Sequence, residues 1–336
     1  MITVRWSVLL AMVGCTHAGA GDSGPAGDSA STADSADSTG NLDSAGGDSG
    51  TPDSGDTAQL GSVAFVGDAV VATALAPVEA VGPGGSATLA MTMLSPGSFT
   101  MGCTVGQEPG CQADEIAHQV TLTHAFALGT TPVTVAQYRA LTGLSPSNLP
   151  DCGDDCPVTE MNYSRAAVVA NALSEAAGLT ACYTCTGSDA TVSCEVLVDP
   201  YACSGYRLPT EAEWEYGARC GTDLEFAGSA DASTVAWTSE NSSATPHAVG
   251  TLAANGCGLY DMSGNVREWI GDGYAAYGSG AVTDPIGASG GGMRSQRGGS
   301  YHEPAEVSHL SNRLYDTMTA AYMSYGVRLA ITVPTN

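Results

Sequence analysis

The sequence contains no lysine: all ten of its basic residues are arginines, and with 35 Asp and Glu the formal net charge is −25 over 336 residues. This absence excludes Schiff-base chemistry on a lysine amine and phosphate-binding loops that depend on a lysine. Such an acidic chain cannot neutralise nucleic-acid phosphates, so we expect no nucleic-acid partner. A hydrophobic content of 43% nevertheless allows a sizeable core.

The start of the chain lacks an apolar run long enough to span a membrane. Arg5 precedes a short apolar run over residues 6–13, which ends at Gly14 and Cys15. Residues 12–15 (MVGC) resemble a bacterial lipobox, whose cysteine is acylated after cleavage; the alternative is an ordinary secretory signal peptide. Both predict export to a compartment that permits disulfides. The lipobox further predicts a signal peptide over residues 1–15, lipidation of Cys15 and a membrane-anchored lipoprotein at the cell envelope or surface.

Residues 16–60 lack the apolar residues that a folded domain needs. No basic or aromatic residue occurs between Ala18 and Leu60, and Asp-Ser pairs recur among Gly, Ala and Thr. Such a segment cannot offset its ordering entropy, and its aspartates repel one another, so we predict a disordered acidic tether. The irregular aspartate spacing disfavours a calcium-binding repeat. Residues 61–87 form a lead-in segment, either a short hairpin or a strand, and residues 88–333 form the globular domain.

Hydrophobic periodicity and turn residues predict an α+β domain. Residues 89–101 are typical of two strands joined by a turn at Ser95-Pro96-Gly97, and residues 120–128 of a further strand. Helices are predicted over residues 132–142, 164–177 and 211–219. Helix signals are absent after residue 219. At the start of the third helix, we expect Arg207, Glu211 and Glu213 to form caps and ion pairs rather than a catalytic group.

Besides Cys15 the chain has ten cysteines, an even number. Five disulfides fit this count, although sequence alone leaves their connectivity open. Two pairs enclose short loops, four cysteines can nest as an outer and an inner pair, and two remain: Cys103 and Cys111, Cys152 and Cys156, Cys182 and Cys203 around Cys185 and Cys194, then Cys220 and Cys257. A zinc site on the four nested cysteines is the alternative, but its spacing matches a zinc ribbon only loosely and export favours oxidation.

Seven stretches occur in an order that resembles one known family. They are residues 98–102 (SFTMG), 132–138 (PVTVAQY), 157–162 (PVTEMN), 206–216 (YRLPTEAEWEY), 258–269 (GLYDMSGNVREW), 297–301 (RGGSY) and 325–330 (YGVRLA). This ordered set resembles the formylglycine-generating-enzyme (sulfatase-modifying factor) domain family over roughly residues 88–333. The resemblance implies the family's fold, a C-type-lectin-like α+β variant with little regular secondary structure.

The 258–269 stretch contains two carboxylates, Asp261 and Glu268, on either side of a short loop that offers carbonyl oxygens. Oxygen ligands of this kind suit a hard cation. The resemblance implies a structural calcium ion held by the side chains of Asp261 and Glu268 and the carbonyls of Gly264 and Val266. The alternative is that Asp261 caps a turn and Glu268 pairs with Arg267 or Arg297.

The family's oxidation of a substrate cysteine to formylglycine uses copper held by two cysteines, which suit copper(I). Those cysteines follow the family's Gly-Gly-Ser-Tyr motif, but here Glu303 occupies the first position and Ser311 lies near the second. No cysteine follows Cys257. We therefore expect no copper. Ser300 matches a serine of the family's active cleft, so Ser300, Glu303 and Ser311 remain cleft candidates.

Two further interpretations concern residues 302–324. His302, Glu303, Glu306 and His309 offer the residue types of a two-histidine, one-carboxylate iron site, but we favour the alternative that they are polar surface residues of a loop. The same fold serves as a binding scaffold in retroelement-diversified proteins, and this interval is rich in residues that make adaptable contacts. Recognition-surface candidates are Tyr301, His302, His309, Asn312 and Tyr315.

The sequence therefore predicts an exported, calcium-stabilised lipoprotein that acts as a binding or structural module, with an unknown protein, peptide or glycan ligand. The alternative is an active oxidoreductase of the family with altered metal ligands, which performs formylglycine generation or non-haem iron oxygenation.

Overall fold

The computed structural model describes residues 70–107, 111–146, 148, 151–288 and 291–334. The predicted signal peptide, the lipidation site at Cys15 and the tether over residues 16–60 lie outside the described residues. Within the described part of the chain, no helix is both long enough and apolar enough to cross a membrane.

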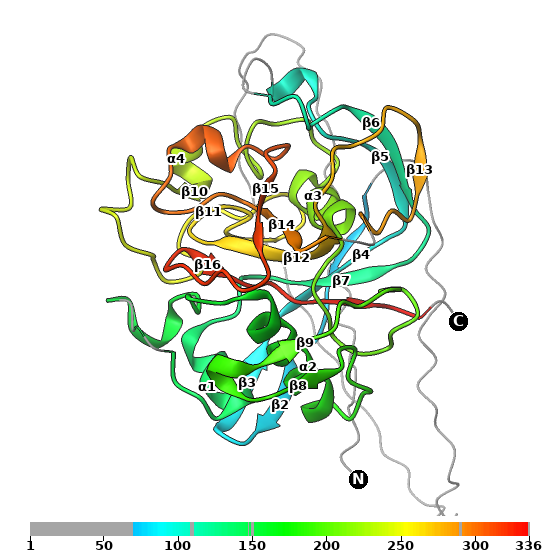
Figure 1. Ribbon diagram of the computed structural model, residues 1–336. Helices are drawn as coiled ribbons and strands as arrows, with labels where there is room; N and C mark the ends of the chain where they lie inside the picture. The colour runs from blue at the N-terminus through cyan, green and yellow to red at the C-terminus, as the bar shows by residue number, and fades with distance from the viewer. Residues whose placement is uncertain (1–69, 108–110, 147, 149–150, 289–290, 335–336) are drawn as a thin grey trace, which may run out of the picture. The chain divides into compact units, whose positions relative to one another are not determined.

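Mixed sheets and few helices make up the fold (Figure 1). The α-helices are α1 (Val135–Thr142), α2 (Tyr163–Ala176), α3 (Glu211–Arg219) and α4 (Ala232–Val235). Short 3-10 helices cover Val105–Gln107, Gly153–Asp155, Asp189–Thr191 and Ala305–Ser308. This confirms the predicted α+β class with little regular structure.

In the described part of the chain, the strands form three larger sheets and three pairs. One antiparallel sheet has the order β1 (Ala72–Ala74), β4 (Met91–Leu94), β7 (Phe126–Gly129) and β17 (Ala330–Thr332). A second has the order β15 (Leu314–Thr317), β14 (Met293–Arg297), β12 (Arg267–Gly273) and β16 (Tyr325–Gly326), with β12 and β16 parallel. The third has the order β13 (Val282–Thr283), β6 (His118–Leu122) and β5 (Gly97–Met101). The pairs are β2 (Val78–Gly82) with β3 (Gly85–Leu89), β8 (Cys185–Thr186) with β9 (Ser193–Cys194), and β10 (Ala236–Trp237) with β11 (Ser263–Gly264).

Local capping explains why the three longer helices form where the sequence predicts them. Thr134 caps α1 through a reciprocal capping box with Gln137, and Gly143 ends it at a φ of 71°. The Asn162 side chain accepts from the backbone N–H of Arg165 at 2.8 Å at the start of α2. Thr210 and Glu213 form the capping box of α3, whose bounds match the prediction.

Two predictions about local structure are wrong. No helix was expected after residue 219, but α4 forms there. It is a single turn capped by the Asp231 side chain, which accepts from Ser233 N at 3.0 Å. The single strand predicted over residues 120–128 is two strands, β6 and β7, in different sheets. The chain turns between them at Thr123, whose backbone N–H donates to Asp284 Oδ1 at 2.8 Å. The described part of the lead-in segment contains a hairpin, β2–β3, which agrees with the first of its two interpretations.

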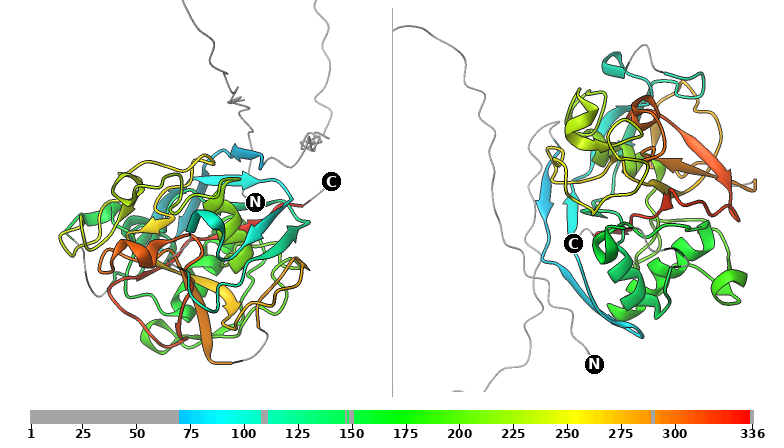
Figure 2. Two further views of the ribbon diagram at one scale, coloured as in Figure 1. Left: turned by 90° about the horizontal axis from the view of Figure 1, so that it is seen from above. Right: turned by 90° about the vertical axis from the view of Figure 1, so that its left-hand side faces the viewer.

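The apolar core has two parts. One lies between α1, α2 and the β2–β3 hairpin, which gather in the lower half of Figure 1 and again in the lower half of the right-hand view of Figure 2; Tyr163, Leu173 and Trp269 are among its fully buried members. The other surrounds α3 and includes Trp214 and Phe126. Both cores reach the sheet that contains β12, so its two faces are covered by different elements.

All ten cysteines from Cys103 to Cys257 form disulfides. The pairs are Cys103–Cys111, Cys152–Cys156, Cys182–Cys203, Cys185–Cys194 and Cys220–Cys257. The four nested cysteines therefore form an outer and an inner disulfide, and the zinc alternative is wrong.

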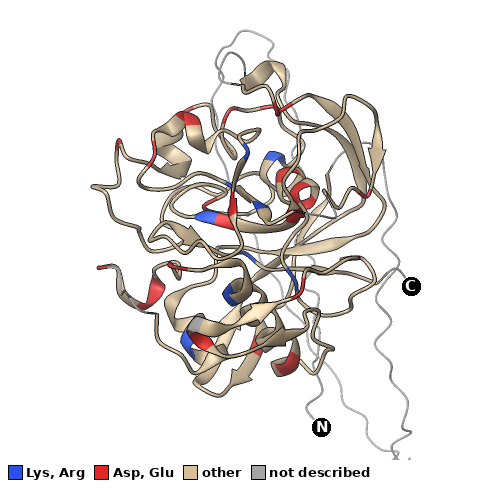
Figure 3. Ribbon diagram, in the orientation of Figure 1, with Lys and Arg blue, Asp and Glu red and all other residues tan. Residues whose placement is uncertain are grey.

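Helix α3 buries three carboxylates, and each meets an arginine. Arg207 donates to both oxygens of Glu213 at 2.7 and 2.8 Å. Arg313 likewise donates to both oxygens of Glu211 at 2.8 and 2.9 Å, and Glu215 pairs with Arg297 and Arg219. Figure 3 shows these charges within the fold around α3. The predicted structural role of Arg207, Glu211 and Glu213 agrees with these contacts.

Replacing Cys220 and Cys257 with alanine is expected to lower the free energy of unfolding by about 4 kcal/mol, because the bond joins residues 37 positions apart. The same replacement of Cys152 and Cys156, which are 4 positions apart, should cost only about 2 kcal/mol. Urea denaturation without reductant measures both values. Equal losses would show that loop closure does not govern the effect.

Glu211→Gln is expected to destabilise the protein by about 3 to 5 kcal/mol at neutral pH, because Arg313 loses its buried partner. Burial raises the pKa of Glu211, but the guanidinium groups of Arg313 and Arg297 outweigh it and hold the pKa below its ordinary value. The ionised group therefore stabilises the fold above about pH 4.5, and this contribution is lost as the pH falls through the folded pKa.

Unfolding of both proteins should accordingly be followed from neutral pH to pH 2. The wild type should lose more stability than Glu211→Gln below about pH 4.5. Asp154→Asn is the matched control, because Asp154 is 65% exposed in its ion pair with Arg139 and should change stability by less than about 1 kcal/mol. Parallel pH curves for Glu211→Gln and the wild type would refute a depressed pKa.

Candidate functional site

The sheet of β15, β14, β12 and β16 presents two different polar faces. Strand register places Glu268 opposite Arg297. Both side chains point to α3: Glu268 accepts a hydrogen bond from Trp214, and Arg297 forms an ion pair with Glu211. Because side chains alternate along a strand, the neighbouring positions lie on the opposite face. That face contains Arg267, Trp269, Arg294, Gln296, Asp316 and Tyr325.

A tight turn after β14 brings Ser300 to the edge of this opposite face. Gly298 and Gly299 have φ values of 96° and 67°, and a Cβ on Gly299 would lie 2.4 Å from Ser308 Oγ, so glycine is required there. Ser300 Oγ donates to Glu303 Oε2 at 2.8 Å. The structure therefore brings together two of the three predicted cleft residues.

Arg267 extends this pair into a longer polar chain. Its Nε donates to Glu303 Oε2 at 2.8 Å, and its guanidinium carbon lies 5.6 Å from the centre of the Tyr325 ring. The Tyr325 hydroxyl in turn donates to Asp316 Oδ2 at 2.7 Å. A carboxylate paired with arginine favours its charged form, so Glu303 is suited to holding its neighbours in place and poorly suited to removing a proton from Ser300.

Ser311, the third cleft candidate, has different partners. It is fully buried, its hydroxyl donates to Glu115 Oε2 at 2.8 Å, and its backbone N–H donates to Gln107 Oε1 at 2.7 Å. Burial raises the pKa of Glu115, although the Ser311 hydrogen bond and the charge of Arg297 oppose that rise. Glu303 is thus an ion-paired carboxylate and Ser311 a buried hydroxyl.

The four residues predicted to hold calcium are all buried. Asp261 Oδ2 accepts from the backbone N–H of Gly250 at 2.7 Å and Oδ1 accepts from Asn265 Nδ2 at 3.3 Å. Burial raises the pKa of Asp261 despite these donors and the nearby Arg328. A buried carboxylate that accepts hydrogen bonds only from neutral donors has the ligand chemistry that a hard cation prefers.

Glu268 fits the same ion less fully. Its Oε1 accepts from Arg328 at 2.7 Å and its Oε2 accepts from Trp214 Nε1 at 2.7 Å. The predicted alternative partners, Arg267 and Arg297, are wrong: Arg267 pairs with Glu303, and Arg297 with Glu211 and Glu215. Any calcium ion would therefore share the Glu268 carboxylate with a guanidinium group.

The structure does not assemble the predicted iron site. His309 is buried, and its Nε2 lies 3.1 Å from Glu225 Oε1, whereas His302 is exposed beside the Tyr301 ring. Among the residues that the structure describes, no group of three His, Cys, Asp or Glu side chains is close enough to hold a metal.

Several recognition-surface candidates are wrong as surface residues. Tyr301, His309 and Asn312 are each no more than 5% exposed: Tyr301 is a core residue, His309 lies against Glu225 and the Phe226 ring, and Asn312 bonds to the buried Glu115. His302 and Tyr315 are exposed, and the Tyr315 ring stacks on Tyr274 at 3.9 Å. Sequence reasoning missed Tyr322 and Met323, which are 59% and 49% exposed; their place just before the 325–330 motif was the available signal.

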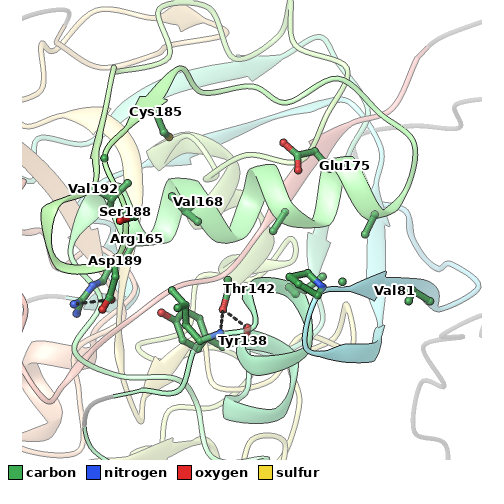
Figure 4. Close-up of a pocket in the computed structure, with 17 residues that line it drawn as sticks. Val81, Tyr138, Thr142, Arg165, Val168, Glu175, Cys185, Ser188, Asp189 and Val192 are labelled. Carbon is green, nitrogen blue, oxygen red and sulfur yellow. Dashed lines mark hydrogen bonds and ion pairs between the residues drawn. The ribbon is translucent and has the colours of Figure 1, made fainter.

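A separate pocket of about 690 Å³ lies between α1, α2, the turn of the β2–β3 hairpin and the β8–β9 segment (Figure 4). Val168, Ala172 and Ala176 form one apolar wall along α2. Arg165 Nη2 and Asp189 Oδ1 are 3.4 Å apart and lie together in Figure 4, away from Glu175. None of the predicted site residues lines this pocket except Cys185.

Comparisons with known proteins agree with the motif order. The profile of the family described as sulfatase-modifying factor enzyme 1-like domain matches residues 82–333. The chain is 36% identical over 115 residues to a formylglycine-generating enzyme of Streptomyces coelicolor, covering 29% of this chain and 37% of that protein. It is 32% identical over 173 residues to "Chaperone protein LppX" of Paenibacillus barcinonensis, covering 43% of this chain. That match spans 61% of the relative's length.

Solved structures show the same fold. "Treponema denticola variable protein 1" superposes with a TM-score of 0.65 and 28% identity, over 76% of this chain and 99% of that one. PvdO from Pseudomonas aeruginosa superposes with a TM-score of 0.58 and 25% identity, over 73% of this chain and 94% of that one. The chain belongs to the formylglycine-generating-enzyme family of sulfatase-modifying factor enzyme 1-like domains.

Proposed function

We propose that the chain is an exported lipoprotein of this family that acts as a binding or structural module and does not oxidise cysteine. The occupancy of the two copper-ligand positions carries the proposal. Glu303 is held by Arg267 and Ser300, and Ser311 is buried against Glu115. Every cysteine in the described residues is in a disulfide, so none of them supplies a thiolate.

Exposed aromatic side chains near this polar chain support a binding role. Tyr322 packs edge-on against Tyr325, and Tyr315 stacks on Tyr274, whose ring centre is 4.9 Å from the Arg313 guanidinium carbon. Tyrosines that are fixed in this way supply contact area at a low entropic cost. A protein, peptide or glycan ligand is the kind of partner that such a surface suits.

Calcium is the second part of the proposal. Asp261 supplies a buried carboxylate that accepts hydrogen bonds from neutral donors, Glu268 supplies one that is shared with Arg328, and Gly264 and Val266 lie between them in the sequence. The ion would fix the loop between β11 and β12 and would have no part in chemistry.

Export and lipidation rest on the sequence of residues 1–15 and on the five disulfides, which suit an oxidising compartment. Together they support a lipoprotein anchored at the cell envelope through Cys15.

The purified protein is expected not to convert a Cys-x-Pro-x-Arg peptide to formylglycine in the presence of copper and oxygen, because the thiolate pair is missing. Mass spectrometry of the peptide measures this, with an authentic formylglycine-generating enzyme as the positive control. Turnover that is lost in Glu303→Gln would refute the proposal and identify an altered catalytic site.

Chelation with EGTA is expected to lower the melting temperature, because calcium bound only to the folded state at about 100 times its dissociation constant contributes about 2.7 kcal/mol. Asp261→Asn should remove this calcium dependence. Asp154→Asn, an exposed aspartate, should keep it. Equal melting temperatures of the wild type in EGTA and in calcium would rule out the structural ion.

A further inference from the structure

Arg294 is a buried arginine without a carboxylate partner. It is 3% exposed, and every other arginine in the described residues forms an ion pair with Asp or Glu. Among the residues that the structure describes, its Nε and Nη1 atoms have no hydrogen-bond partner. The chain as a whole has a large excess of carboxylates, so the missing ion pair of Arg294 does not reflect a shortage of carboxylate partners.

Two other unsatisfied polar groups lie beside Arg294. Gln296, two residues along β14 and therefore on the same face, is fully buried with neither amide atom bonded. The Tyr163 hydroxyl at the start of α2 is also without a partner, and its ring centre lies 5.7 Å from the Arg294 guanidinium carbon. Trp269 links the group, because it faces Gln296 in register and packs edge-on against Tyr163.

Two carboxylates lie near Arg294, and neither forms an ion pair with it. Asp316 lies opposite Arg294 in the β14–β15 register, but its oxygens accept from the Tyr325 hydroxyl and from Thr317 N, each at 2.7 Å. Asp272 is buried near Tyr163 and accepts from the backbone of Glu211 at the start of α3. Burial raises the pKa of Asp272 well above its ordinary value, and the neighbouring Glu211 adds to this rise.

A guanidinium group cannot release its proton at physiological pH, so Arg294 stays charged in its buried position. Ordered water can satisfy its N–H donors but cannot balance its charge, and an unpaired buried charge is strongly destabilising. The charge, the two free Arg294 nitrogens, the Gln296 Nε2 group and the Tyr163 hydroxyl all call for an acceptor that carries one negative charge.

We propose that Arg294, Gln296 and Tyr163 bind a small monovalent carboxylate, for which formate is the smallest probe. A carboxylate offers two oxygens, which can accept from Arg294 and from the Gln296 amide at once. Burial raises the pKa of Tyr163, so its hydroxyl remains a donor. A doubly charged anion is disfavoured by Asp316 and by the acidic chain. This site is distinct from Ser300 and Glu303, and the proposed function does not depend on it.

Thermal unfolding in sodium formate tests the site, with the same ionic strength maintained by a bulky sulfonate buffer anion. Formate at about 100 times its dissociation constant should raise the melting temperature of the wild type by about 5 °C. Equilibrium dialysis with labelled formate should show saturable binding of a single ion per chain. Absence of both effects would mean that only water fills the site and would overturn the proposal.

Arg294→Met should abolish formate binding and the melting-temperature shift. Arg139→Met, which removes an arginine from an exposed ion pair, is the matched control and should keep both. If Arg294→Met does not fold, Gln296→Leu decides the question, because it retains the charge and should weaken formate binding about 10-fold. Unchanged formate affinity in Gln296→Leu, or retained binding in Arg294→Met, would overturn the assignment.

Discussion

The burial of three glutamates on one short helix is the constraint on which most of this structure depends. Removing one carboxylate from water costs several kcal/mol. This cost is offset only where a guanidinium group donates hydrogen bonds to the carboxylate with good geometry. Arg297 from β14 and Arg313 next to β15 therefore have to meet Glu211 and Glu215. These ion pairs fix the sheet of β12, β14 and β15 against α3, and that position decides which side chains reach its opposite face.

Arginine is the only basic residue that this chain can use for the task. Its planar fork serves two or three acceptors at once, as Arg328 shows by donating to Glu268, to the Gly129 carbonyl and to the Tyr260 carbonyl. One such residue joins β7, the loop before β11 and β12. A lysine would bring a point charge without this geometry, so a fold with little regular structure is held together by arginine-centred polar contacts as well as by apolar packing.

Features that depend on residues close together in the sequence could be predicted, whereas contacts between distant residues could not. The caps of α1, α2 and α3 lie within three residues of the groups that they bond, so sequence spacing reveals them. The end of β6 depends on Asp284, which is 161 residues away from Thr123. Similarly, Ser300 and Glu303 are three residues apart and were grouped from the sequence. Their link to Arg267 and the pairing of Glu268 with Arg328 could not be derived, because alternation along a strand does not say which of several arginines lies opposite.

The distribution of arginines also determines where trypsin-like proteases can cut the chain. Trypsin-like enzymes cut only after lysine or arginine, and between Arg5 and Arg139 the chain has neither, so the whole acidic segment from residue 16 to 60 is no substrate for them. In the described residues the arginine side chains in ion pairs are at most 33% exposed. A composition that restricts how the core can be built therefore also leaves such proteases few places to release the domain from its predicted anchor.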